Sequence, residues 1–225
     1  KSPSDFLGYE LGTQFTRHHQ VIDYVNHVAE NSDFAQTTPY GKTNEDRTLQ
    51  LVYLSAPENL AQLETMRQDH LRSIGYAEGA KETTKEFSIV WLSYNVHGNE
   101  STSTEAALKT LHTLVTEKQD WLENLIVIMD PCINPDGRDR YVNWYNQVKS
   151  TPFDSSPLAN EHFEDWPGGR YNHYYFDLNR DWAWLSQKES QQRLPNYLAW
   201  MPQIHVDFHE QGVDSPYYFA PAVEP

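Results

Sequence analysis

Cysteine is nearly absent from this chain, because Cys132 is the only one among its 225 residues. A single cysteine excludes an intrachain disulfide and gives no support to a redox function. Cys132 follows the apolar run of residues 126–129, so we expect a buried, unreactive thiol. Long hydrophobic runs are missing too, since no stretch reaches the roughly 18 apolar residues that a membrane-spanning helix needs.

Positively charged residues are also scarce. Lys and Arg number 17 against 32 Asp and Glu, which gives a net charge of -15, and no cluster of Lys or Arg interrupts this excess. Such a field repels phosphate groups, so the sequence predicts no binding to nucleic acids or to anionic membranes. The first residues, Lys-Ser-Pro-Ser, form no hydrophobic signal segment, which is compatible with a cytoplasmic protein or with a mature exported one.

The composition that remains is typical of one globular domain. Hydrophobic residues make up 38% of the chain, and its 7 Trp and 14 Tyr can both fill a core and line a concave site. Apolar periodicity predicts alternating helices and strands, which indicates an α/β fold with a mixed, largely parallel sheet. The expected helices are residues 16–30, 58–74, 100–118 and 187–198, and the expected strands are residues 48–54, 87–94, 125–129 and 203–208. Outside them we expect a turn at residues 37–42 and a long loop at residues 138–182.

A histidine and a glutamate, His97 and Glu100, follow the predicted strand 87–94 directly. Separated by two residues, they can offer one imidazole nitrogen and one carboxylate to the same metal ion. His209 closes the last predicted strand, and ligands of such sheets bind beyond the carboxyl ends of the strands. Two imidazoles and one carboxylate suit Zn2+ and would leave one position open for water. Without further motifs, His97 could equally be a turn residue and Glu100 an acid at a helix N-terminus.

Two more motifs lie between the halves of this predicted metal site. Residues 134–137 read Asn-Pro-Asp-Gly, which we interpret as a rigid turn that shapes a cleft, and residues 177–180 read Asp-Leu-Asn-Arg. In this order the motifs resemble those of the zinc carboxypeptidases of the carboxypeptidase A type, the M14 or funnelin peptidases. Residues 166–170, Trp-Pro-Gly-Gly-Arg, are similar to a bacterial branch of that superfamily. The resemblance extends over residues 38–209 and implies a carboxypeptidase-like sheet with helices on both faces.

The resemblance also implies a role for each matching residue. The implied ligands of a single zinc ion, together with water, are His97, Glu100 and His209. Asp177 would accept a hydrogen bond from a ligand histidine and so fix its tautomer. Asn179 and Arg180 would grip the terminal carboxylate of the substrate, because the planar guanidinium of arginine can bind a carboxylate through two parallel hydrogen bonds.

An arginine that stabilises the oxyanion of the tetrahedral intermediate is implied as well. Our choice is Arg170, which lies upstream of the Asn-Arg pair, with Arg138 and Arg140 as competing candidates. His205 is not expected to be a ligand. On a strand it would face the same side as His209 but lie about 13 Å away, at about 3.3 Å per residue.

Near its end the sequence departs from the family pattern. In the family, the general-base glutamate and a tyrosine that caps the substrate come well after the last zinc ligand, whereas this chain stops at Pro225. Glu210 should face away from the site, because adjacent residues on a strand point to opposite sides, and Glu224 lies too near the chain end. We therefore expect residues 1–225 to form a single, incomplete domain with weak or no activity, whose base lies after Pro225.

The function that the resemblance implies is zinc-dependent removal of a C-terminal residue from peptides with a free C-terminus. Two alternatives stay open: a hydrolase of the same fold acting on cell-wall peptides or N-acyl amino acids, and a degenerate module that only binds carboxylates. The resembled branch consists largely of exported bacterial enzymes, so a periplasmic or secreted location is expected. The sequence implies no particular oligomeric state.

Overall fold

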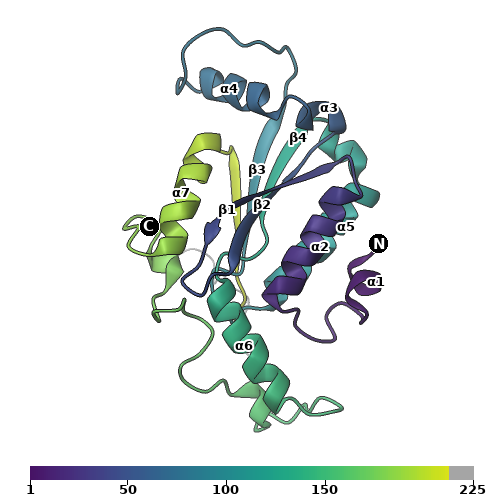
Figure 1. Ribbon diagram of the computed structural model, residues 1–225, viewed down its shortest axis with the longest axis vertical. Helices are drawn as coiled ribbons and strands as arrows, with labels where there is room; N and C mark the ends of the chain where they lie inside the picture. Colours follow the sequence, from purple (N-terminus) through teal and green to yellow (C-terminus); the bar gives the residue numbers. More distant parts are fainter. Residues whose placement is uncertain (213–225) are drawn as a thin grey trace, which may run out of the picture.

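The computed structural model describes residues 1–212 and shows a five-stranded sheet with helices on both faces (Figure 1). The strands lie in the order β1-β2-β4-β3-β5. Their bounds are Ala35–Lys42 (β1), Thr48–Leu54 (β2), Ser88–Tyr94 (β3), Leu125–Asp130 (β4) and Ile204–Phe208 (β5). β3 is parallel to β4 and β5, whereas β2 is antiparallel to β1 and β4. The predicted mixed α/β sheet is confirmed, and its parallel pairings lie in the half that carries the predicted metal ligands.

Most of the helices lie on one or the other face of the sheet (Figure 1). The α-helices of the described chain are Pro3–Leu7 (α1), His18–Glu30 (α2), Pro57–Leu60 (α3), Leu63–Ser73 (α4), Thr102–Thr116 (α5), Pro135–Val148 (α6) and Lys188–Trp200 (α7). Short 3-10 helices span Gln119–Glu123 (η1), Asn160–His162 (η2) and Leu178–Arg180 (η3). Buried side chains of α2 and α5 pack on one face of the sheet, and those of α3, α4 and α7 pack on the other.

Strand β4 shows why the sheet needs helices on both faces. Successive side chains of a strand point to opposite sides. Ile126 and Ile128 accordingly belong to the core beneath α4 and α7, while Val127 and Met129 belong to the core beneath α2 and α5. All four are buried. A strand whose successive residues 126–129 are all apolar can leave neither face to water.

One segment that we expected to be a turn is part of a strand instead. The turn predicted at residues 37–42 is wrong, because these residues belong to β1, which pairs with β2 along its whole length. Pro39 and Gly41 suggested a turn, but the structure accommodates them at an irregularity of the register on a strand that lies at the sheet edge. Conversely, the single helix expected at residues 58–74 is divided into α3 and α4.

The loop predicted from residue 138 onward is also wrong at its start, because residues 135–148 form α6. The Asn-Pro-Asp-Gly motif is the beginning of this helix. Asn134 is the N-cap, whose side-chain oxygen accepts a hydrogen bond from the Gly137 amide at 3.0 Å, and Pro135 occupies the first helical turn. Between α6 and α7 the chain follows an irregular path that contains only η2 and η3.

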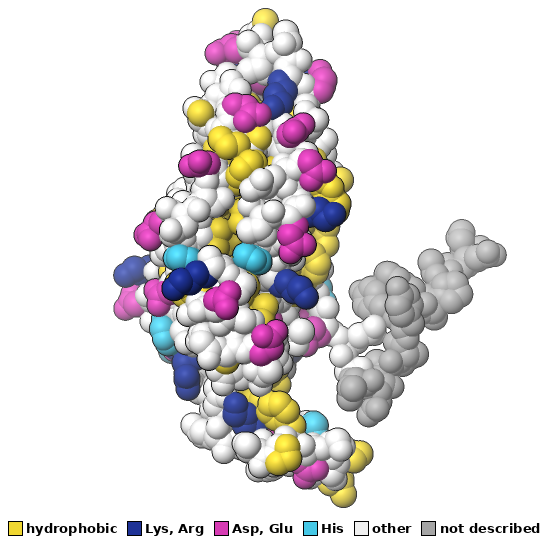
Figure 2. Space-filling view, turned by 90° about the vertical axis from the view of Figure 1, so that its right-hand side faces the viewer, with side chains coloured by type: hydrophobic (Ala, Val, Ile, Leu, Met, Phe, Trp, Pro, Cys, Tyr) yellow, Lys and Arg dark blue, Asp and Glu magenta, His cyan; other side chains and the backbone are white. Residues whose placement is uncertain are grey.

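The surface agrees with the acidic composition. On the face seen from the α2 and α5 side, Lys and Arg side chains lie apart from one another among more numerous acidic ones (Figure 2). Among residues 1–212, every helix is too short or too polar to span a bilayer.

Candidate metal centre

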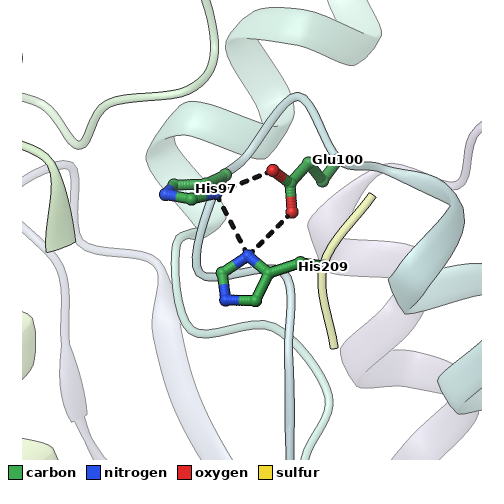
Figure 3. A group of neighbouring side chains, drawn as sticks. All are labelled: His97, Glu100 and His209. Atoms are coloured by element: carbon green, nitrogen blue, oxygen red, sulfur yellow. Dashed lines mark hydrogen bonds and ion pairs between the residues drawn. The ribbon is translucent and has the colours of Figure 1, made fainter. Parts of the chain in front are cut away.

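The carboxyl ends of β3 and β5 bring the predicted ligands together. These strands are parallel, and Tyr94 pairs with Phe208, so the residues that follow them lie at the same edge of the sheet. His97 comes three residues after Tyr94, and His209 directly follows Phe208. Glu100 stands just before α5, on the loop that His97 begins. Three side chains from two separate segments therefore meet at one point (Figure 3).

The donor atoms of these side chains face one another. His97 Nδ1 lies 2.7 Å from Glu100 Oε1 and 3.3 Å from His209 Nδ1, and His209 Nδ1 lies 3.1 Å from Glu100 Oε2 (Figure 3). All lie within 4.8 Å of one another, as donors around one ion would. The set of two imidazole nitrogens and one carboxylate fits zinc, which accepts mixed nitrogen and oxygen ligands. His97 is buried and His209 more exposed, so the site opens to solvent on one side.

The Nε2 nitrogen of each imidazole, on the opposite side of the ring from the other donors, contacts a carboxylate. His97 Nε2 lies 3.2 Å from Asp177 Oδ1, and His209 Nε2 lies 3.1 Å from Asp207 Oδ2. A proton kept on Nε2 by such a carboxylate leaves the lone pair of Nδ1 free for a metal. Our sequence reasoning missed Asp207. Asp207 lies two residues before His209, but this position alone does not mark an acid as the partner of an imidazole.

Ionisation of the donors suits metal binding. Burial opposes ionisation of Glu100, but hydrogen bonds from His209, from His97 and from the Glu210 amide lower its pKa to about 2. Hydrogen bonds to Asp207 and then to Glu100 raise the pKa of His209 to about 10. Glu100 is therefore ionised at neutral pH, and in the absence of a metal His209 holds a proton that an ion would displace.

Arg170 stands beside the donors, unlike the two arginines that compete with it. Its Nη2 is 3.0 Å from Asp177 Oδ2, its Nη1 is 4.0 Å from Glu100 Oε1, and its side chain is partly exposed. Arg138 is fully buried and paired with Glu105. Arg140 donates to backbone carbonyls of the loop between α6 and α7. Of the three, the structure places only Arg170 where it could touch a substrate at the donors.

Asn179 and Arg180 lie in η3, directly after Asp177. Asp177 caps this short helix, because its Oδ1 accepts a hydrogen bond from the Asn179 amide at 2.9 Å. Arg180 is exposed, and its one side-chain hydrogen bond within residues 1–212 goes to the Asn179 carbonyl, at 3.2 Å, while neighbouring Asp181 accepts hydrogen bonds from Ser186 and Gln187. Among the described residues, the guanidinium of Arg180 thus has no charged partner.

His205 and Glu210 lie as predicted, away from the three donors. His205 Nε2 is 2.9 Å from Ser93 Oγ, and its ring packs among Trp182 and Tyr197. The Glu210 carboxylate turns toward the start of α5, where it accepts a hydrogen bond from the Ser103 amide at 3.1 Å. Burial raises the pKa of Glu210. Glu224 lies outside the described residues.

A second group of possible donors, from Glu45, Asp136 and His173, has a different character. The guanidinium of Arg47 lies among these acids, 2.8 Å from Asp136 Oδ1 and 2.5 Å from Glu45 Oε2. The positive charge of the Arg47 side chain already compensates these acids, so the group is an ion-pair network.

Comparison with known proteins decides the family. Residues 21–198 match the sequence model described as zinc carboxypeptidase, which covers most of the chain. The chain belongs to the zinc carboxypeptidase family. Members of this family are zinc-dependent metallopeptidases, and the resemblance carried by the four motifs is confirmed at this level. No curated protein matches the chain in sequence.

Solved carboxypeptidases share the fold. The metallo-carboxypeptidase from Burkholderia cenocepacia is 16% identical, with a TM-score of 0.56, over 86% of this chain and 40% of that one. Carboxypeptidase A from Helicoverpa armigera is 14% identical, with a TM-score of 0.55, over 93% and 52%. The metallo-carboxypeptidase from Pseudomonas aeruginosa, in complex with (2-guanidinoethylmercapto)succinic acid, is 15% identical, with a TM-score of 0.53, over 88% and 40%. This zinc carboxypeptidase chain therefore spans about half of these proteins or less.

Proposed function

We propose that this chain supplies the metal centre and the carboxylate clamp of a zinc-dependent carboxypeptidase that removes a C-terminal residue from peptides. The observation that carries the proposal is the convergence of His97 Nδ1, a Glu100 oxygen and His209 Nδ1 within 4.8 Å of one another. The carboxylates that hold both imidazoles by Nε2 add support, because they select the tautomer that a metal requires.

When bound, zinc supplies an activated water and polarises the scissile carbonyl. Side chains of the protein would stabilise the oxyanion and bind the substrate. Arg170, whose guanidinium lies beside Glu100, would stabilise the negative charge that develops on the carbonyl oxygen. Arg180 and Asn179 would bind the terminal carboxylate of the substrate and so place the last peptide bond at the metal.

We propose that the general base lies after Pro225, as the family pattern implies. The base must be a free group within reach of the water, but the carboxylates that contact the donors are engaged. Asp177 binds His97 and Arg170, Asp207 binds His209, and Glu210 binds the start of α5. With this arrangement the chain by itself should turn over peptides weakly or not at all.

The test compares a peptide that has a free C-terminus with the same peptide after C-terminal amidation. The enzyme in its natural length should release the last amino acid from the free form, as mass spectrometry would show, and a chelator should abolish the release. Release of an N-acyl group, or cleavage restricted to cell-wall peptides, would favour the alternative hydrolases. Zinc-dependent binding without cleavage would favour the carboxylate-binding module.

We also propose that the enzyme works in the periplasm or after secretion. The resemblance to a branch of largely exported bacterial enzymes supports this location. Fractionation of the source cells, with immunodetection of the enzyme, tests it directly, and recovery only with cytoplasmic markers would contradict it.

A further inference from the structure

Asn95 occupies an unusual backbone position directly after β3. Its φ is 59°, in the left-handed region that few residues other than glycine and asparagine adopt, and its side chain is completely buried. Asn95 precedes His97 by two residues, at the point where the chain leaves the strand and turns into the loop that carries His97 and Glu100. Buried polar side chains are normally hydrogen-bonded, so the hydrogen bonds of Asn95 should account for its burial and its conformation.

The amide nitrogen of Asn95 spans the whole metal-binding loop. Asn95 Nδ2 lies 2.6 Å from the His97 carbonyl, 3.0 Å from the Glu100 carbonyl and 3.3 Å from the Gly98 carbonyl. One side chain thus contacts the backbone of both predicted ligands on the loop, and of a residue between them. Gly98 also lets this loop lie close against α6, because a Cβ there would collide with the backbone of the first turn of that helix.

The other end of the amide is held by the core. Asn95 Oδ1 accepts hydrogen bonds from Arg138 Nη1 and Thr104 Oγ1, both at 3.2 Å. Arg138 also donates to the Ser101 carbonyl at 2.8 Å and pairs with Glu105 at 2.5 Å. These donors require Oδ1 to face Arg138, so Nδ2 must face the loop carbonyls. The amide can therefore act as a clamp in one orientation only.

We propose that Asn95 is a positioning residue of the metal centre, which holds the His97–Glu100 loop in its ligating shape before an ion binds. The proposal rests on the zinc site proposed above. Arg138, which our sequence reasoning weighed as an oxyanion ligand, acts here as the support of the clamp. Loss of the clamp should leave both ligands present but free to move relative to each other, and so weaken the hold on the metal.

Two substitutions separate the parts of the clamp. Asn95→Gly keeps the backbone conformation but removes the side chain. Asn95→Asp keeps the shape, tolerates the left-handed φ and can still pair with Arg138, but offers the loop carbonyls no donor. The matched control is Asn59→Asp, because Asn59 is equally buried and its Nδ2 donates to the Leu122 and Glu123 carbonyls, remote from the metal centre.

Zinc affinity is measured by competition with a chelator, and the unfolding midpoint of the metal-free form is measured beside it. Both Asn95 variants should bind zinc about 10- to 100-fold more weakly, the size typical of groups that orient metal ligands, and Asn59→Asp should not. Cobalt(II) in place of zinc should show an altered visible spectrum in the Asn95 variants alone, because the ligand geometry changes.

Each outcome has a distinct meaning. Unchanged zinc affinity in Asn95→Asp, with a lowered midpoint like that of Asn59→Asp, would show that Asn95 serves the fold alone and would overturn the proposal. If Asn95→Gly does not fold, the isosteric Asn95→Asp variant carries the test. Failure of the unsubstituted enzyme to bind zinc would instead reject the proposed metal site itself.

Discussion

Among the donor residues, His209 has the most strongly shifted pKa, and this shift gives the first prediction. With its pKa raised to about 10 by hydrogen bonds to Asp207 and Glu100, His209 is protonated in the metal-free site at neutral pH. Zinc must displace that proton, so zinc affinity should rise about tenfold per pH unit between about pH 7 and pH 9. Calorimetry in buffers of different ionisation enthalpy should find about one proton released per ion. Affinity that does not change across this range would contradict the assigned protonation.

Arg180 gives the second prediction. Its side chain makes no ion pair in the described structure, so Arg180→Ala should leave stability unchanged while it removes part of the proposed carboxylate clamp. Catalytic efficiency of the enzyme on peptides with a free C-terminus should fall about ten- to a hundred-fold, which corresponds to about 1.5–3 kcal/mol for a charge-assisted contact. Amidated peptides should be affected far less. Arg17→Ala, at another exposed arginine, is the control, and equal losses on both kinds of peptide would make Arg180 structural.

Single residues were predictable where a motif ties them to a strand end. His97, Glu100 and His209 have fixed offsets from apolar runs, so their types and order suffice to suggest a metal. Asp207 and Asn95 could not be found in this way. Asp207 reveals its role only through the 3.1 Å contact with His209, and Asn95 only through contacts with the loop that folds back over it. An acid or amide at such a position has no periodic or compositional signature.

At the scale of elements, the long helices and apolar strands were predicted within a few residues, but β1 and α6 were not. Both contain Pro and Gly, whose usual meaning is a break. In β1 the edge position tolerates Pro39, and in α6 Pro135 occupies the first turn, where its missing amide costs nothing. The meaning of these residues depends on neighbours that a local pattern does not contain.

The start of α6 gives the third prediction. Asn134 is fully buried, caps the helix through Gly137 and donates to the Arg170 carbonyl at 3.2 Å. Asn134→Ala should lower the free energy of unfolding by about 0.5–2 kcal/mol, the range for a lost N-cap. Urea denaturation measures the change. Asn143→Ala, at an exposed position of the same helix, should stay within about 0.5 kcal/mol of the parent, and an equal effect of both substitutions would argue against the cap.

At the scale of the whole molecule, the alternation of strands and helices predicted the α/β sheet, and the family resemblance implied helices on both of its faces. The sequence did not predict the strand order. Strands β1 and β2 are neighbours both in the sequence and in the sheet, but β4 lies between β2 and β3. The local residue pattern does not show which strands will pair with each other. The assignment to the zinc carboxypeptidase family rests on the family model that residues 21–198 match, and the single-domain boundary at residues 1–225 stays a prediction.

Stability of the whole fold should depend on His18, which gives the fourth prediction. Burial lowers its pKa to about 4, while its Nε2 contacts the Thr48 carbonyl at 2.7 Å. The folded state therefore binds fewer protons than the unfolded state between about pH 6.5 and pH 4, so stability should fall as the pH drops through this window. The loss from this one group is at most about 3 kcal/mol. His18→Gln should flatten the profile, whereas exposed His19→Gln should not, and a profile that His18→Gln leaves unchanged would contradict the account.

The zinc content of single-histidine variants is the most direct test of the metal centre. Elemental analysis should find one zinc ion per molecule in the enzyme and in His205→Ala, since His205 lies four residues before His209 but contacts Ser93. His97→Ala and His209→Ala should each lose most of the bound zinc, because each removes one of three protein ligands. A full equivalent of zinc retained by either variant would show that the ion binds elsewhere and would contradict the proposed site.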